Sequence, residues 1–370
     1  MNQNNGTLRL GMFVMPIHDP AKPAAQCYDE DLELAILCED LGFHDFWVGE
    51  HHSSTYENIV MPEIFLGKVL GQTRSIRVGP APVCLQYHHP AHVANRLAFL
   101  DHLSHGRLNI CFGPGAVPTD MELFGVQPHE TGARVAEAID MILKIWTSEP
   151  PYRMEGRFWK LRLEDSLDLA MGIGQLHKPY QRPYPPIFVP GISRSSPGLT
   201  AAATRGFRLL SHHMVRHDVL AAQWQSYREA AEFAGRIPTS ADWGITRNVF
   251  VAETTAEAQR VARTNSLGSC IEYILNLTQR TSPTGLKMWK PDPAMDESDC
   301  NLDYFMRDVI IAGDPPHVAE QLCALRQRTG PFGSLVLVAH DWDDRARWIR
   351  SLELFAREVM PIVNRSLELL

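Results

Sequence analysis

The sequence lacks the features that would bring the protein to a membrane or a nucleic acid. No stretch of its 370 residues approaches the ~20 consecutive apolar residues of a membrane-spanning helix. There is no basic run, and the formal net charge of −8 makes a polyanion an unfavourable partner. Residues 1–7 are polar and uncharged, without the basic and apolar regions of a signal peptide. We therefore expect a cytoplasmic protein with a short frayed N-terminus that binds neither membranes nor nucleic acids.

Cysteine is also scarce, and its positions show no pattern. The seven cysteines are Cys27, Cys38, Cys84, Cys111, Cys270, Cys300 and Cys323. Their number is odd, and no two of them form a C-x-x-C pair. This distribution is typical of a reducing compartment, and it argues against a disulfide framework or a cysteine zinc site.

Internal repeats are absent as well, and what remains is an alternation of short apolar runs with helical patterns. The predicted strands are residues 8–15, 46–48, 76–84, 108–112, 186–189, 207–210, 248–252 and 335–339. The predicted helices are residues 29–41, 62–70, 90–103, 131–146, 196–205, 217–234, 255–275, 314–328 and 343–363. Because the strands are continuous apolar runs rather than alternating ones, they are typical of a buried parallel sheet.

Eight strands, each followed by a helix, predict an α/β fold of the (β/α)8 TIM-barrel type. Pro16 ends the first strand, and no glycine-rich turn follows it, which counts against a Rossmann nucleotide site. Barrels of this length often form one unit, so we expect a single domain over residues 1–370. Two insertions interrupt the alternation. The first is residues 150–185, with a hairpin around Gly156, and the second is a lid-like loop over about 277–306.

A polar cluster, Glu50-His51-His52, follows the second predicted strand directly. In parallel α/β folds, ligands collect at the carboxyl ends of the strands, so the cluster is a candidate catalytic site. These side chains could equally have only a structural role, forming hydrogen bonds at the polar rim of the barrel. The cluster could also belong to a metal site, because other histidines stand at predicted strand ends: His88, His89, His212, His213 and His340. The first strand lacks an H-x-H pair, so we predict no metal.

Several short motifs resemble those of the bacterial luciferase-like flavin monooxygenases. They are Glu50-His51-His52, Val78-Gly79, His89-Pro90, residues 103–107, Gly191 to Ser196, residues 339–342 and the last helix around residues 351–361. Each motif is weak alone, but together they follow the family's order on an independently predicted barrel. Within the family, the chain looks most like the type II Baeyer–Villiger (diketocamphane) and limonene-monooxygenase-like members.

This resemblance implies a dimeric barrel that binds FMN at the C-terminal face. A separate flavin reductase would supply reduced FMN, and one atom of O2 would be inserted into a hydrophobic organic substrate by Baeyer–Villiger oxidation, hydroxylation or epoxidation. Two alternatives stay open: a deazaflavin-dependent oxidoreductase on the same fold, and a non-catalytic flavin-binding protein. The intact Glu50-His51-His52 cluster counts against the second of these.

His51 resembles the catalytic histidine of the family. An ordinary histidine pKa near ~6.5 would let it exchange a proton with a flavin–oxygen adduct at neutral pH. Glu50 could orient a histidine, bind the substrate or be a buried structural acid. We assign His52, the neighbour of His51, to the substrate pocket.

The resemblance also places the flavin. The predicted contacts are Ala81, Pro82, Gly113, Pro190, Gly191, Ser193, Arg194, Ser195 and Ser196. In luciferase the dipeptide matching Ala81-Pro82 is cis beneath the flavin ring, and here both isomers stay open. The serines open a predicted helix, where they could cap the helix and bind the flavin phosphate. Luciferase has an arginine after strand four where this chain has Pro114, so either Arg194 replaces that charge or phosphate binding is weaker.

The substrate pocket is expected to be mostly apolar. The predicted substrate residues are Met15, Glu50, His52, Tyr87, His212, Trp289 and Trp342. Aromatic residues at strand ends are also common in cores, so both interpretations stay open for them. Cys111 lies within the fourth predicted strand, and we expect it to be a core residue rather than a reactive thiol.

Overall fold

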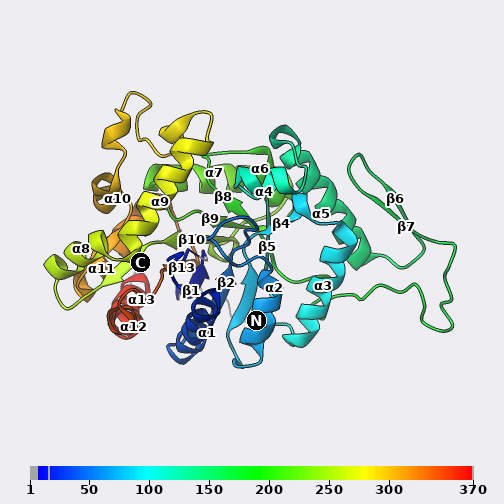
Figure 1. Cartoon of the computed structure of the whole chain (residues 1–370), viewed down its shortest axis with the longest axis horizontal. Helices are drawn as coiled ribbons and strands as arrows, with labels where there is room; N and C mark the ends of the chain where they lie inside the picture. The colour runs from blue at the N-terminus through cyan, green and yellow to red at the C-terminus, as the bar shows by residue number, and fades with distance from the viewer. Residues whose placement is uncertain (1–6, 16, 369–370) are drawn as a thin grey trace.

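The computed structural model describes residues 7–15 and 17–368, so the expected frayed tail up to residue 6 and Pro16 lie outside the described residues. Parallel strands form a barrel with helices around it (Figure 1). The eight barrel strands are β1 (Arg9–Val14), β2 (Asp45–Val48), β3 (Arg77–Pro80), β5 (Ile110–Gly113), β8 (Ile187–Gly191), β9 (Arg208–Ser211), β10 (Trp243–Arg247) and β13 (Ser334–Ala339). The sheet order is β3-β2-β1-β13-β10-β9-β8-β5-β4, where β4 is Val83–Cys84.

The two ends of this sheet meet at Val78. Val78 pairs in parallel with Leu108, and its carbonyl accepts a 2.9 Å hydrogen bond from the Asn109 amide. This contact closes the ring, so the predicted (β/α)8 barrel is confirmed.

The barrel interior is a small apolar cluster separate from the larger core outside it. Its residues are Trp47, Ala81, Cys111, Phe188, Leu210 and Val336, with Phe13 packed against them. Trp47 meets the Phe188 ring edge to face at 4.9 Å between centroids. Cys111 is buried here, as predicted, and burial raises the pKa of its thiol well above the usual range.

The helices lie outside the barrel and cover its apolar outer face. They are α1 (Ala24–Asp40), α2 (Pro62–Leu70), α3 (Pro90–Leu103), α5 (Thr131–Thr147), α6 (Pro197–Arg205), α7 (His217–Phe233), α11 (Pro315–Thr329), α12 (Arg345–Leu354) and α13 (Met360–Glu368). Proline occupies the first turn of α2, α3, α6 and α11, where its missing N–H leaves no hydrogen bond unmade. No described helix is long and apolar enough to span a membrane.

The prediction for the seventh strand was wrong. The barrel strand is β10, whereas Val249–Val251 forms β11, which pairs with β12 (Ile311–Gly313) in a separate two-stranded sheet. Both segments are buried, but Arg247 and Thr246 make β10 look polar in sequence. The apolar run beside it was therefore the more attractive choice.

Two predicted helices are divided. Residues 255–275 contain all of α8 (Thr255–Thr264) and the start of α9 (Ser266–Thr281). Asn265 caps α9 by accepting a hydrogen bond from the Leu267 amide at 3.0 Å. The last predicted helix is α12 and α13 joined by a π-helical turn at Phe355–Val359. A further short helix, α4 (Pro118–Leu123), was not predicted.

The first insertion contains the predicted hairpin. Its strands β6 (Tyr152–Glu155) and β7 (Lys160–Leu163) are antiparallel, with Gly156 in the turn, and it projects from the side that carries α3 and α5 (Figure 1). The second insertion, residues 277–306, runs from the end of α9 through two short turns into α10 (Leu302–Asp308). It is folded against the barrel, since Trp289 is buried.

Candidate active site

His51 lies at the C-terminal end of β2 between two carboxylates. Its Nε2 is 2.9 Å from Glu57 Oε2, and its Nδ1 is 3.5 Å from Asp120 Oδ2. Burial alone would lower the pKa of His51, but Asp120 and Glu57 raise it to about 9. The sequence suggested an ordinary histidine pKa, whereas the structure makes this imidazole a cation at neutral pH.

Asp120 is fixed in turn by the segment that carries His51. It accepts hydrogen bonds from the His52 amide at 3.2 Å and from the Ser53 hydroxyl. Burial acts to raise the pKa of Asp120, but His51, Ser53 and this amide hold it below its usual value. Sequence reasoning missed Asp120 and Glu57. The one available signal was an acid two residues after Pro118, as at a helix start.

Glu50 belongs to a different network from that of His51. It is 1% exposed, and its Oε1 lies 2.7 Å from His52 Nε2 and 2.6 Å from His88 Nε2. Its Oε2 accepts a hydrogen bond from the Cys84 amide at 3.1 Å. Burial would raise the pKa of Glu50, but the hydrogen bonds from His52, His88 and Cys84 lower it to about 2.

The ligand atoms of Glu50, His52 and His88 lie within 4.8 Å of one another, so they could hold a metal ion. Their separations of 2.6 and 2.7 Å are those of short charge-assisted hydrogen bonds, and with the Cys84 amide they give both carboxylate oxygens a partner within the protein. We therefore assign the cluster to anchoring the ends of β2 and β4 beside His51.

A cavity of about 670 Å³ opens at the C-terminal ends of β5 and β8, between α5 and α6. Four of the predicted flavin contacts line it: Gly113, Pro190, Ser193 and Ser196. A Cβ on Gly113 would lie 2.9 Å from Pro190 and 3.0 Å from Pro82, so the wall requires glycine there. The Ala81-Pro82 bond is cis. The other five predicted contacts lie outside the cavity lining: Ala81, Pro82, Gly191, Arg194 and Ser195.

The N-terminus of α6 faces this cavity with hydroxyl groups. Ser196 caps the helix by accepting a 3.1 Å hydrogen bond from the Leu199 amide, and Ser193 donates to the Ser195 carbonyl at 2.9 Å. Arg194 is half-exposed and pairs with Asp218, so in this structure its charge is directed away from the cavity. The cation that lines the cavity is Arg205, which the sequence did not suggest.

Five of the seven predicted substrate residues form two contact groups, one of Glu50, His52 and Tyr87 and one of His212 and Trp289. Tyr87 meets the His52 ring edge to face at 5.8 Å. His212 stacks on Trp289 of the second insertion, with centroids 5.6 Å apart. Burial, followed by the charge of Arg247, lowers the pKa of His212 to about 4, so this imidazole is neutral where His51 is charged.

Met15 and Trp342, the remaining predicted substrate residues, pack against the main hydrophobic core. Met288, beside Trp289, instead lines the 670 Å³ cavity. The second insertion therefore contributes a side chain to the cavity wall, as a lid would.

Comparison with known proteins identifies a family. The family described as luciferase-like monooxygenase matches residues 8–331. The 3,6-diketocamphane 1,6-monooxygenase of Pseudomonas putida is 30% identical over 96% of this chain and 98% of its own length. The limonene 1,2-monooxygenase of Rhodococcus erythropolis is 28% identical over 99% and 89%.

The comparison with solved structures leads to the same group of relatives. The oxygenating constituent of 3,6-diketocamphane monooxygenase, a type II Baeyer–Villiger monooxygenase from a Pseudomonas putida plasmid in complex with FMN, superposes with a TM-score of 0.86 at 29% identity. It covers 96% of this chain and 98% of that one. An F420-dependent secondary alcohol dehydrogenase superposes with a TM-score of 0.72 over 96% and 99%. Because its identity is only 18%, that likeness concerns the fold alone.

Proposed function

The chain belongs to the luciferase-like monooxygenase family, and we propose that it is the oxygenase of a two-component system. It uses reduced FMN and O2 to insert one oxygen atom into a hydrophobic organic substrate. The observation that carries this proposal is the cavity at the C-terminal face, whose glycine and proline wall, serine hydroxyls and helix N-terminus suit a flavin. The charged His51 stands on the same face of the barrel.

The residues of the cavity fit FMN. Its apolar walls suit an isoalloxazine ring, and its volume lies within the range of ligand pockets. Gly113 leaves space where any side chain would meet Pro82 and Pro190. The phosphate would lie at the N-terminus of α6, where backbone amides and the helix dipole favour an anion. Ser193 and Ser196 would contribute their hydroxyls.

When bound, reduced FMN supplies the activation of O2. His51 holds a proton on each ring nitrogen, because Glu57 and Asp120 stabilise its cation. Nε2 is paired with Glu57 at 2.9 Å, whereas Nδ1 stands 3.5 Å from Asp120 and has no hydrogen-bond partner among the described residues. The Nδ1 proton is therefore the one that can be donated to an oxygen that develops negative charge. Glu50 positions this segment by anchoring the end of β2 to His88 and Cys84.

The substrate is a hydrophobic compound such as a cyclic ketone or an alkene. Support comes from the apolar lining of the cavity, from the neutral His212 stacked on Trp289 and from the substrates named for the relatives. Met288 and Trp289 cover the substrate from the second insertion. A neutral imidazole at His212 suits a dry pocket, because a cation there would require solvation.

We also propose that the protein is a homodimer. Apolar side chains are exposed on the neighbouring helices α2 and α3: Ile64 is 72% exposed, Phe99 61% and Leu103 50%. Side chains of this kind on adjacent helices mark an interface, and a second copy would bury them. A flavin reductase is a further, transient partner, as the oxygenase-component name of one relative suggests. The seven free cysteines support a cytoplasmic location.

The function is tested by adding air to a mixture of the protein, reduced FMN and a panel of cyclic ketones and alkenes. We expect oxygenated products by mass spectrometry and none without the protein. A parallel reaction supplies reduced deazaflavin instead of FMN. Tight deazaflavin binding with substrate reduction, and no oxygenated product from FMN, would establish the alternative of a hydride-transferring enzyme.

A further inference from the structure

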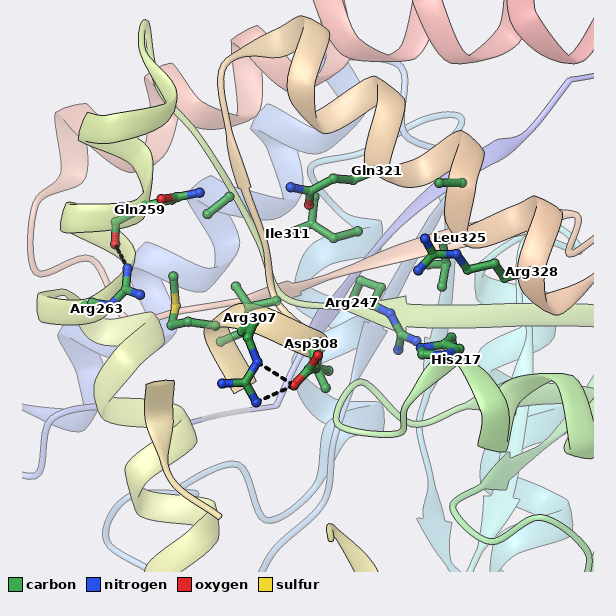
Figure 2. A pocket seen from close by; sticks show the side chains of 15 residues that line it. His217, Arg247, Gln259, Arg263, Arg307, Asp308, Ile311, Gln321, Leu325 and Arg328 are labelled. Carbon is green, nitrogen blue, oxygen red and sulfur yellow. Dashed lines mark hydrogen bonds and ion pairs between the residues drawn. The ribbon is translucent and has the colours of Figure 1, made fainter. Parts of the chain in front are cut away.

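A second pocket, which shares no lining residue with the flavin cavity, lies among β12, α8, α10 and α11 (Figure 2). Its volume is about 470 Å³. Four arginines line it, Arg247, Arg263, Arg307 and Arg328, against the single carboxylate of Asp308. The pocket is therefore strongly cationic in a chain whose net charge is −8.

Arg247 places a buried positive charge at this pocket. It is only 2% exposed, and its guanidinium donates to backbone carbonyls: Nη1 to Thr246 at 2.9 Å and Nη2 to Val215 at 3.0 Å. Within residues 7–15 and 17–368, no carboxylate forms an ion pair with it. Burial lowers the pKa of Arg247 to about 9. A buried charge without a counterion is unfavourable, so an anion entering the pocket would stabilise the folded protein.

The other arginines are arranged to share such an anion. Arg328, from α11, also has no carboxylate partner among the residues that the structure describes. Arg263 pairs with Asp303 at 3.2 Å, and Arg307 pairs with Asp308 at 2.8 Å, so both are partly neutralised. Figure 2 shows the Arg307–Asp308 pair together with the side chains of Arg247 and Arg328 that line the same pocket.

The chemistry of the lining indicates the class of ligand. Planar guanidinium groups match the oxygens of a phosphate through paired hydrogen bonds. His217 places the N-terminus of the long helix α7 at the pocket, and its dipole also favours an anion. Apolar side chains share the lining, namely Met306, Ile311 and Leu325, so the pocket suits an anion with an organic part.

We propose that this pocket binds a small organic phosphate, at a site separate from that of the flavin. Inorganic phosphate offers the same charge without the apolar part. Because the two ligands differ only in that part, comparing them tests the whole lining and not the arginines alone.

The test is isothermal titration calorimetry on protein loaded with one equivalent of FMN, so that the flavin phosphate position is filled and no free FMN competes for the arginine pocket. The probes are phenyl phosphate and inorganic phosphate. We expect saturable binding at one site per chain, tighter for phenyl phosphate. Binding should weaken about tenfold or more in Arg328→Gln, and further in Arg247→Met. The control Arg357→Gln changes an exposed arginine outside the pocket that pairs with Glu353, and it should bind as the unchanged protein does.

Arg328 is exposed, so Arg328→Gln should fold even if Arg247→Met does not. FMN affinity should be the same in all these variants, which separates this site from the flavin cavity. The proposal is overturned by the absence of saturable binding, or by binding that Arg328→Gln leaves unchanged.

Discussion

His51 owes its charge to two carboxylates, Glu57 from its own loop and Asp120 from α4. Its place at the end of β2 could be predicted, because an apolar run that turns polar marks a strand end on the ligand-binding face. Asp120 and Glu57 could not be predicted as its partners. Asp120 approaches His51 only once α4 has formed and packed beside the end of β2, and Glu57 only once the loop after β2 has folded back on itself. The same holds for His88, which meets Glu50 from the segment after β4.

Replacing His51 tests its role in the reaction directly. In His51→Gln the side chain keeps a hydrogen-bond donor but loses the charge, so product formation should fall by about 10²- to 10⁴-fold, the usual contribution of acid–base groups. FMN affinity should stay within about twofold. The control is His129→Gln at an exposed histidine. Unchanged product formation in His51→Gln, with flavin bound, would remove His51 from the mechanism.

His51 should also make stability depend on pH. Its pKa is about 9 in the folded protein and near 6.5 when unfolded, so the folded state binds the proton more tightly. The stabilisation is complete below about pH 6.5 and is lost as pH rises to about 9. Urea unfolding at a series of pH values should show this decline, and His51→Gln should flatten it. An equal decline in both proteins would contradict the assigned ion pairs.

Among the elements, the apolar runs identified seven of the eight barrel strands to within a few residues, because buried parallel strands need continuous apolar sequence. The seventh was misplaced because Arg247, in β10, is a buried charge that no local pattern reveals. The break between α8 and α9 was missed because Asn265 lies in an otherwise uninterrupted helical pattern. Packing and capping decide such boundaries, and both depend on the finished fold.

The ends of β5 and β8 form a wall of the proposed flavin cavity, and Gly113 is the point where this wall is most tightly packed. In Gly113→Ala the added methyl would lie 2.9 Å from Pro190, so Pro190, which lines the cavity, must shift. We expect FMN affinity to fall about tenfold or more in fluorescence titrations. Gly67→Ala, in α2, meets no atom within 4 Å and is the matched control. Equal FMN affinity in Gly113→Ala would place the flavin elsewhere.

At the scale of the whole molecule, we propose that residues 1–370 act as one domain in which the hairpin and the second insertion are extensions of barrel loops. Their presence could be predicted from irregular sequence, but the packing of Trp289 on His212 could not. The family resemblance recognised from short motifs is confirmed by a match over residues 8–331.

The proposed dimer gives a whole-molecule prediction. In Phe99→Asp a charge replaces an exposed ring on α3, so the protein should become monomeric in size-exclusion chromatography with light scattering. Phe233→Asp is the control, since Phe233 is 93% exposed at the end of α7, away from α2 and α3. A dimer that persists unchanged in Phe99→Asp would exclude this face as the interface.

The central claim is that this barrel inserts one atom of O2 into an organic substrate. It is tested most directly by running the reaction with reduced FMN, a cyclic ketone and ¹⁸O2, and by measuring the mass of the product by mass spectrometry. The account predicts one ¹⁸O atom per product molecule, formed only in the presence of the protein. Turnover of the substrate to a product that contains no ¹⁸O would contradict it.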